Sequence, residues 1–290
     1  MTTGANLVGD GHPDRVALEG LARRARALVI QSVATAGAGH IGGPLSAIDL
    51  LVALYFRILA VRPHEPGWPD RDRFILSKGH SAIGLYAVLA LRGYFAVDEL
   101  ATFDRLDSRL QGHPDMTLLP GLDMSTGSLG MGLSAGIGIA LGARLNGTPE
   151  RTYVMLGDGE CQEGQVWEAA FVAARYSLDN LTAIVDVNGL QQYGWAGSAI
   201  DVRQPPWGPT ALARQWEAFG WAVFEADGHD VDDIERAVRA AAATTGRPAV
   251  VLARTVKGKG VTFMEGRFEW HARIPTAVEL TAALEELGVA

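Results

Sequence analysis

The residues best suited to chemistry are an aspartate and an asparagine thirty positions apart, each directly after a short apolar run. Asp158 follows the run 152–156 within the sequence Gly-Asp-Gly-Glu, and Asn188 follows the run 181–187. A carboxylate and a carboxamide provide two hard oxygens, which can hold Mg²⁺ when water, a backbone carbonyl and phosphate oxygens complete its coordination. A Gly-Asp-Gly turn alone is common, but together with the asparagine it predicts a metal-bridged diphosphate site.

The two residues converge only if the segments around them form one βαβ unit. Between the apolar runs lies an amphipathic segment of helical length, 163–176. The strands of such a unit are parallel, so both side chains emerge at carboxyl ends of strands. That edge is where open α/β sheets bind their ligands.

The rest of the chain predicts an α/β fold, a parallel sheet with helices on both faces, because strand and helix patterns alternate through its second half. We expect a flexible N-terminus at 1–13 and a single domain at 14–290. The other expected strands are 73–77, 221–226 and 248–254, and the other expected helices are 14–36, 45–59, 81–92, 133–146, 210–219, 230–243 and 276–287. Segment 93–126 is expected to be irregular. The first helix is expected to have a basic outer face made of Arg15, Arg23, Arg24 and Arg26.

Composition excludes several functional classes. A net charge of −8 and a pI near 5.4 give no basic face for nucleic acid or for an anionic membrane. The sequence shows no apolar run of about 18–20 residues, as a membrane span requires, and no signal-peptide pattern. The single cysteine, Cys161, is expected to pack in the core, because Glu160 and Glu163 would oppose its ionisation. We therefore expect a soluble, cytoplasmic protein.

Four histidines lie beside glycine or proline in predicted loops and form a second candidate set. They are His40, His80, His113 and His271. Glycine lets backbone and ligand approach closely, and an imidazole there can donate to a hydroxyl or a phosphate while titrating near neutrality. The three lysines of the chain fall in two motifs, Ser-Lys-Gly-His at 77–80 and Lys-Gly-Lys-Gly at 257–260, which suggests positions that need a compact ammonium.

Seven motifs follow one another along the chain. They are GAGH (37–40), FILSKGH (74–80), QGHP (111–114), STGSLGMG (125–132), GDGECQEGQVWEAA (157–170), LDNLTAIVDVNGLQQYG (178–194) and KGKG followed by WH (257–271). Together they closely resemble the amino-terminal, diphosphate-binding half of transketolases, with matching order and spacing from about Arg15 to Ile274. The resemblance implies a thiamine diphosphate-binding fold with thiamine diphosphate and Mg²⁺ as cofactors.

The resemblance also implies roles for individual residues. Mg²⁺ would be held by Asp158, Asn188 and the backbone carbonyl of Leu190. Other cofactor contacts would come from His80, Gly127, Ser128, Leu129, Gly159, Glu163 and Lys257. Histidines matching His40 and His271 act on the sugar's hydroxyls during proton transfer in transketolases, and the one matching His113 faces the donor. Glu163 and Glu168 resemble acids that link paired active sites through a dimer interface, although both also fit an exposed helical face.

Two local departures from the family pattern concern the donor sugar. The turn after His40 reads Ile-Gly-Gly, where many transketolases have proline followed by small or hydroxyl residues. A hydroxyl contact near the cofactor is therefore expected to be missing. His271 is followed by Ala-Arg rather than by the usual glycine.

The larger departure is length, since the second half of transketolases carries a pyrimidine-binding domain and the glutamate that activates the cofactor. The resemblance therefore implies the amino-terminal subunit of a split transketolase that transfers a two-carbon ketol unit from a sugar phosphate donor, with a separate pyrimidine-domain subunit in an α2β2 assembly. Some two-gene relatives instead pass a hydroxyacetyl unit to a lipoyl or acyl carrier protein, and this acceptor stays open.

Two other classes compete with this interpretation. The alpha subunit of a 2-oxoacid dehydrogenase also carries a Gly-Asp-Gly and asparagine site, but the histidine set favours transketolase. Dinucleotide binding is disfavoured, because Gly130, Gly132 and Gly136 do not have the spacing of the nucleotide fingerprint and no acidic residue follows a next strand at the expected distance.

Overall fold

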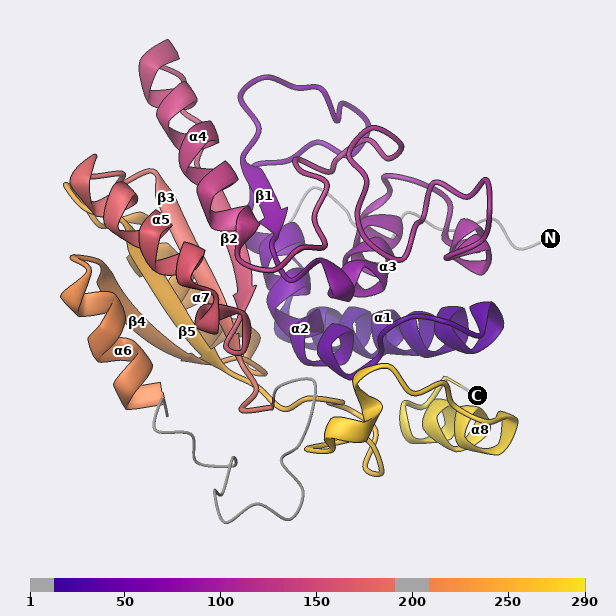
Figure 1. The fold of residues 1–290 in the computed structure, drawn as a ribbon. Helices are drawn as coiled ribbons and strands as arrows, with labels where there is room; N and C mark the ends of the chain where they lie inside the picture. The colour runs from indigo at the N-terminus through magenta and orange to yellow at the C-terminus, as the bar shows by residue number, and fades with distance from the viewer. Residues whose placement is uncertain (1–12, 191–208, 290) are drawn as a thin grey trace.

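A five-stranded parallel sheet forms the centre of the molecule in the computed structural model, which describes residues 13–190 and 209–289. The strands stand in the order β1-β2-β3-β5-β4, and every neighbouring pair is parallel. All their carboxyl ends therefore meet at one edge (Figure 1). The strands are β1 (Arg73–Leu76), β2 (Thr152–Gly157), β3 (Leu181–Val187), β4 (Ala222–Asp227) and β5 (Ala249–Arg254).

Helices cover both faces of this sheet, as the sequence predicts (Figure 1). One face packs against α4 (Met131–Asn146), α5 (Gly164–Arg175) and α6 (Pro209–Ala218). The other packs against α1 (Arg15–Ala36), α2 (Gly42–Ala53), α3 (Ala82–Arg92) and α7 (Val231–Ala242), with α8 (Ala277–Glu286) against α1. The strands bury apolar side chains on both faces, which is why they read as continuous apolar runs rather than alternating ones.

Segment 93–126 is irregular apart from a 3-10 helix at Val97–Thr102, in agreement with the sequence. A π-helical turn at Leu54–Ile58 extends α2, so that the predicted helix 45–59 is found as two pieces that begin three residues earlier. The predicted loop with Pro205 and Pro206 lies outside the described residues. Among those described, no helix is long and apolar enough to cross a membrane.

The expected basic face of α1 needs one correction. Arg15, Arg23 and Arg24 are exposed, but Arg26 is only 5 % exposed. Its guanidinium makes an ion pair with Asp49 of α2, itself 6 % exposed. A buried charge needs a partner of opposite sign, and in the sequence this partner was not apparent, since it lies on another helix.

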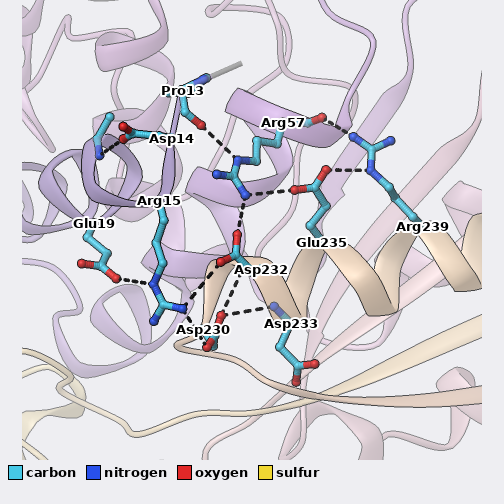
Figure 2. Close-up of polar contacts among 11 residues, drawn as sticks. Pro13, Asp14, Arg15, Glu19, Arg57, Asp230, Asp232, Asp233, Glu235 and Arg239 are labelled. Carbon is cyan, nitrogen blue, oxygen red and sulfur yellow. Dashed lines mark hydrogen bonds and ion pairs between the residues drawn. The ribbon is translucent and has the colours of Figure 1, made fainter. Parts of the chain in front are cut away.

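A network of ion pairs joins the start of α1 to α7 on the surface (Figure 2). Arg15 of α1 pairs with Asp230, whose side chain also caps α7. Arg57 pairs with Asp232 and Glu235 of α7 at 2.7 and 3.0 Å. These contacts hold the N-terminal part of α7 against α1 and against the π-helical turn at Leu54–Ile58.

Candidate functional site

The carboxyl edge of the sheet brings the two predicted metal ligands to neighbouring turns. Asp158 follows β2 and Asn188 follows β3, its neighbour in the sheet. The Asp158 carboxylate accepts hydrogen bonds from the Gly159 N–H at 2.8 Å and the Gly189 N–H at 2.6 Å, so that it joins both turns. The Asn188 Oδ1 accepts from the Leu190 N–H at 3.1 Å. Each of these oxygens keeps a further lone pair for a ligand.

A buried aspartate of β3 that the sequence analysis did not single out lies behind these turns. Asp186 is fully buried and forms an ion pair with the equally buried Lys78. The Asp186 carboxylate also accepts from the Ser46 hydroxyl at 2.6 Å, from the Thr255 hydroxyl and from the Asn188 amide at 3.3 Å. Turns after β1, β3 and β5 are thus tied to one carboxylate, and Asp186 orients Asn188.

The charge of Asp186 also affects Asp158. Burial first, and the neighbouring Asp186 charge second, raise the pKa of Asp158 to about 6. A cation bound beside this buried carboxylate would lower its pKa again, because opposite charge favours the ionised form.

The four histidines of the sequence analysis converge on the same edge. The ring centroid of His40 lies 5.2 Å from that of His80, 6.0 Å from that of His113 and 5.0 Å from that of His271. The rings of His80 and His271 are 5.2 Å apart. Residues separated by up to 231 positions in the chain (271 − 40) therefore form one cluster, although the sequence could only associate them by type.

Three of these imidazoles are held in the neutral form. Burial is the main cause that lowers the pKa of His40, His80 and His271, the last to about 3, and nearby lysines and histidines lower it further. The sequence-based expectation that these groups titrate near neutrality is therefore wrong for His80 and His271 in the ligand-free protein. A neutral imidazole offers one N–H donor and one acceptor.

Lys257 connects the histidines to the metal-ligand turns. It is 2 % exposed, and burial, followed by the charge of Lys78, lowers its pKa to about 8. Its ammonium donates to the Nδ1 of His271 at 2.8 Å. The His271 Nε2 must then carry the ring proton in the neutral form, and it is the nitrogen left free to meet a ligand.

Glycines let two of the loops approach closely at this edge. A Cβ added at Gly79 would lie 2.7 Å from the backbone nitrogen of Gly127, so the turn after β1 and the loop before α4 touch backbone to backbone. Glu160 is 3 % exposed, and its role in this loop was not predicted from the sequence. Its carboxylate accepts hydrogen bonds from the N–H of Gly130 at 2.9 Å and from that of Gly157 at 3.1 Å, and so ties the loop before α4 to the end of β2.

Five predicted residues are exposed in the isolated chain, and His113 is one of them. Ser128 and Leu129 lie on the outer side of the loop before α4, and Glu163 and Glu168 lie on the exposed side at and after the start of α5. The alternative of an exposed helical face, kept open for both glutamates, describes their position. Whether they also line a subunit interface stays a prediction.

The two local departures have structural explanations. A Cβ at Gly42 would lie 2.9 Å from the Trp270 carbonyl oxygen and 3.0 Å from the Lys257 Cγ, so the glycine makes room for Lys257. Arg273 lies over the ring of Trp270 at 4.4 Å and pairs with Glu279 of α8 at 2.5 Å. The arginine after His271 therefore holds the C-terminal helix.

Cys161 is buried in the core, as expected, and burial together with Glu160 raises the pKa of its thiol well above the ordinary value. A surface pocket of about 340 Å³ contains none of the predicted site residues and is lined by Phe263, Arg267, Glu269, Trp270, Arg273 and Glu279. The predicted site residues thus lie at the carboxyl edge of the sheet rather than in that pocket.

The donor set at this edge fits a magnesium-bridged diphosphate. The described residues contain no cluster of three or more His, Cys, Asp or Glu side chains that could hold a metal alone. A site with one carboxylate and one carboxamide suits Mg²⁺ whose remaining ligands are a carbonyl, water and phosphate oxygens. The buried Ser81 hydroxyl beside His80 has no partner in the described chain, and Lys257 supplies positive charge, so an anion finds donors here.

Comparison with known proteins gives a consistent result. A family model described as the thiamine diphosphate binding domain of transketolase matches residues 19–290. The chain is 44% identical over 262 residues to SqwG, the 6-deoxy-6-sulfo-D-fructose transketolase subunit of Clostridium sp. (strain MSTE9), covering 90% of this chain and 93% of that protein. It is 40% identical over 271 residues to one subunit of the apulose-4-phosphate transketolase of Phocaeicola vulgatus, covering 93% and 94%.

Solved structures extend the comparison to longer transketolase chains. The crystal structure of transketolase from Campylobacter jejuni superposes with a TM-score of 0.85 at 30% identity. The match covers 95% of this chain but only 43% of the Campylobacter jejuni chain. The chain thus spans nearly all of the two relatives named as subunits and less than half of the Campylobacter jejuni transketolase chain.

Proposed function

Because the chain belongs to the transketolase family of transferases, as its thiamine diphosphate-binding domain, we propose that it is the amino-terminal subunit of a two-chain transketolase. Its reaction would be the Mg²⁺-dependent transfer of a two-carbon ketol unit from a ketose phosphate. The observation that carries this proposal is the convergence of Asp158, Asn188, Lys257 and the histidine cluster at one edge of the sheet.

Residues of the two turns and of the β5 loop would bind the cofactor. Asp158, Asn188 and the Leu190 carbonyl would hold Mg²⁺, and Lys257 with His80 would neutralise and hydrogen-bond the diphosphate. Thiamine diphosphate supplies carbanion-stabilising chemistry when bound. The local cations allow an anion to bind although the whole chain carries a net charge of −8.

The histidines would move protons on the hydroxyls of the sugar. The His271 Nε2–H can donate to a substrate oxygen, because Nδ1 is occupied by Lys257 at 2.8 Å. His40, between His80, His113 and His271, can accept a proton from a hydroxyl that lies against it. A bound dianion would raise the pKa of these imidazoles, since negative charge favours the protonated form.

A separate pyrimidine-domain subunit would supply the other wall of the site. Four large apolar side chains on the segment before α4 and at its first residue are exposed: Met116 (50%), Leu118 (44%), Leu129 (36%) and Met131 (41%). Such an apolar edge beside a ligand site is typical of a surface that another polypeptide covers. The relatives named as transketolase subunits match over nearly their whole length, which supports the same arrangement.

The donor is proposed to be a ketose with an anionic group. The two relatives described above are named for 6-deoxy-6-sulfo-D-fructose and for apulose 4-phosphate, which carry a sulfo group and a phosphate. The carrier-protein acceptor of the sequence analysis differs from an aldose only after the ketol unit has been taken up. Testing an aldose phosphate and a lipoyl carrier with one donor would separate the two acceptors.

Asp158→Ala tests the metal and cofactor site. The change removes the carboxylate that joins the two turns, so Mg²⁺ loses its only charged protein ligand. We expect the affinity for thiamine diphosphate at saturating Mg²⁺ to fall by at least ~10–100-fold, as when a metal site is disturbed. Isothermal titration calorimetry on the full chain measures this affinity.

The matched control is Asp98→Ala, which removes an exposed carboxylate from the 3-10 helix at Val97–Thr102. It should leave cofactor affinity unchanged. Unaltered binding by the Asp158→Ala chain, with the wild-type chain binding normally, would refute the assignment of Asp158.

A further inference from the structure

The loops that follow β4 and β5 are locked together beside the site. The Gly228 N–H donates to the Arg254 carbonyl oxygen at 2.7 Å. A Cβ at position 228 would lie 2.4 Å from the Thr255 Cγ2, so the two loops approach more closely than any residue but glycine permits. This contact places His229 against the residue that precedes Lys257.

Both ring nitrogens of His229 are engaged. The Val256 N–H donates to Nε2 at 2.8 Å, and Nδ1 lies 2.7 Å from the Asp49 Oδ2. Because Nε2 accepts a hydrogen bond, it carries no proton, so Nδ1 carries the ring proton and donates to Asp49. Asp49 is held in turn by the buried Arg26 of α1. The orientation of the imidazole is thus fixed by side chains of α1 and α2.

The hydrogen bond to Val256 acts on the turn that carries the site lysine. Lys257 follows directly, and the next N–H, that of Gly258, donates to the Gly42 carbonyl oxygen at 3.0 Å. The turn is therefore anchored on one side by His229 and on the other by the start of α2. Between these two anchors the Lys257 ammonium reaches the His271 Nδ1 at 2.8 Å.

We propose that His229 is a positioning residue, which through the Val256 amide sets the place of the Lys257 ammonium and thereby the affinity of the site for a diphosphate. The role of Lys257 toward the diphosphate rests on the proposed function. The placement of the Val256–Lys257 turn by His229 does not, because it follows from contacts within the chain.

His229 is not needed to attach its own loop. Asp230 caps α7 and pairs with Arg15 at 3.3 Å (Figure 2), and β4 pairs with β5 along its whole length. Loss of the hydrogen bond to Val256 should therefore displace the turn at 256–258 while the fold persists. This separates a positioning role from a purely structural one.

Two substitutions remove one hydrogen bond each. In His229→Gln the side-chain oxygen can reach the position of Nε2 and accept from Val256, whereas the contact with Asp49 is lost. In His229→Asn the shorter amide can reach the position of Nδ1 and donate to Asp49, whereas Val256 loses its acceptor. Both variants lose one buried contact, so they should lose similar thermal stability.

The proposal predicts different site properties for the two variants. In His229→Asn we expect the Val256 amide to exchange with solvent about fivefold faster, the effect of one ordinary hydrogen bond, and Mg²⁺–diphosphate affinity to fall ~10–100-fold. In His229→Gln both should stay within about threefold of wild type, the error of such comparisons. Hydrogen-exchange NMR and calorimetry with inorganic diphosphate and Mg²⁺ on the full chain measure them.

The same substitutions at the exposed His64 are the matched controls and should change neither property. Equal diphosphate affinities for the Gln and Asn variants, whether both normal or both weak, would overturn the proposal. A ¹⁵N spectrum of wild-type protein at pH 7 that shows the His229 proton on Nε2 would overturn it as well, even if a variant failed to fold. If the wild-type chain bound no diphosphate, the proposed function would fail, and Val256 exchange would still decide the positioning role.

Discussion

The imidazoles of His40, His80 and His271 share an environment that resists protonation. They are packed around one another with ring centroids 5.0 to 5.2 Å apart, and the Lys257 ammonium contacts one of them. Adding a proton to any of the three costs more than in water, because the charge would be partly buried and would lie near other cations. This cost gives the free protein a specific response to acid.

We predict that stability falls as the pH drops below 6.5. The pKa of His271 is lowered from 6.5 to about 3, so between these values the unfolded chain binds more protons than the folded chain. The stability of the neutral form is therefore complete above pH 6.5 and is lost progressively toward pH 3. At pH 5 the loss from this one group is about 2 kcal/mol. Urea unfolding at pH 7, 6 and 5 measures it.

His271→Gln removes the titrating group, so the variant should lose about 2 kcal/mol less than wild type between pH 7 and pH 5. His64→Gln, at an exposed position, should retain the wild-type slope. Identical slopes for wild type and His271→Gln would show that His271 is not held neutral by the fold.

A second prediction at this scale concerns catalysis in the assembled enzyme. If His40 and His271 move protons on the substrate, alanine at either position should reduce turnover by ~10²–10⁴-fold. Cofactor affinity should stay within a few-fold of wild type, because neither side chain is assigned to the metal or the diphosphate. Steady-state kinetics with a calorimetric measure of cofactor binding test both. Loss of binding without a separate loss of turnover would reverse the roles.

Residue types could be predicted better than residue environments. Asp158, Asn188 and the histidines are found at one edge, as the strand–turn pattern and the family resemblance suggested. Asp186 escaped notice because a single carboxylate inside an apolar strand looks like part of a buried run. Its partner Lys78 lies 108 residues earlier, so no local pattern reveals the ion pair. The neutral state of the histidines likewise depends on burial, which spacing does not determine.

At the scale of elements, α4 reaches the sheet through two glycines. A Cβ at Gly132 would lie 2.4 Å from the Ser77 hydroxyl oxygen, and one at Gly136 would lie 2.5 Å from the Val154 Cγ2. The helix therefore packs closely on β1 and β2, and its N-terminal loop comes to rest against the site.

Gly136→Ala should destabilise the isolated chain. The added methyl group would overlap Val154, and overpacking of this kind costs typically about 1–3 kcal/mol. Gly138→Ala is the matched control in the same helix, since nothing lies within 4 Å of its added Cβ. There the better helix propensity of alanine should stabilise by about 0.5–1 kcal/mol. Denaturant unfolding shows whether each substitution raises or lowers the free energy of unfolding. Equal changes for the two variants would contradict the described packing of α4.

Most elements could be predicted to within two or three residues, because buried parallel strands and amphipathic helices leave strong patterns. Predicted strand 181–187 is found with the same bounds, whereas α4 begins two residues earlier than expected. Its first residues, Met131 and Gly132, follow Gly130 in a left-handed conformation, which the glycine-rich sequence did not distinguish from a continuing loop. Arg26 was wrongly predicted to lie on the exposed face of α1, because helix periodicity alone does not show a buried partner on α2.

At the scale of the whole molecule, the chain should be inactive alone. Leu129 and Met131 are exposed beside the proposed site, and the surface pocket of about 340 Å³ contains none of the predicted site residues. We predict no ketol transfer from a ketose phosphate by the purified chain, and thiamine-dependent transfer in a stable hetero-oligomer after addition of a pyrimidine-domain subunit. A coupled assay and size-exclusion chromatography measure the two.

The Asp158→Ala chain is the control for assembly, because the substitution lies in the site and leaves the exposed apolar edge unchanged. It should join the hetero-oligomer without supporting transfer. Robust turnover by the wild-type chain with no partner present would rule out the split-enzyme proposal.

The contacts of Asp186 determine when during protein synthesis this site can exist. Its carboxylate binds Ser46, Lys78 and Thr255, which are 140, 108 and 69 residues away in the chain. Contacts at such separations require large loops to close, and they form late. A nascent chain on the ribosome thus exposes the helix that carries Ser46 and the turn that carries Lys78 long before Asp186 and β5 have emerged. A cofactor that binds at these turns can therefore stabilise the folded protein only after translation has passed Thr255.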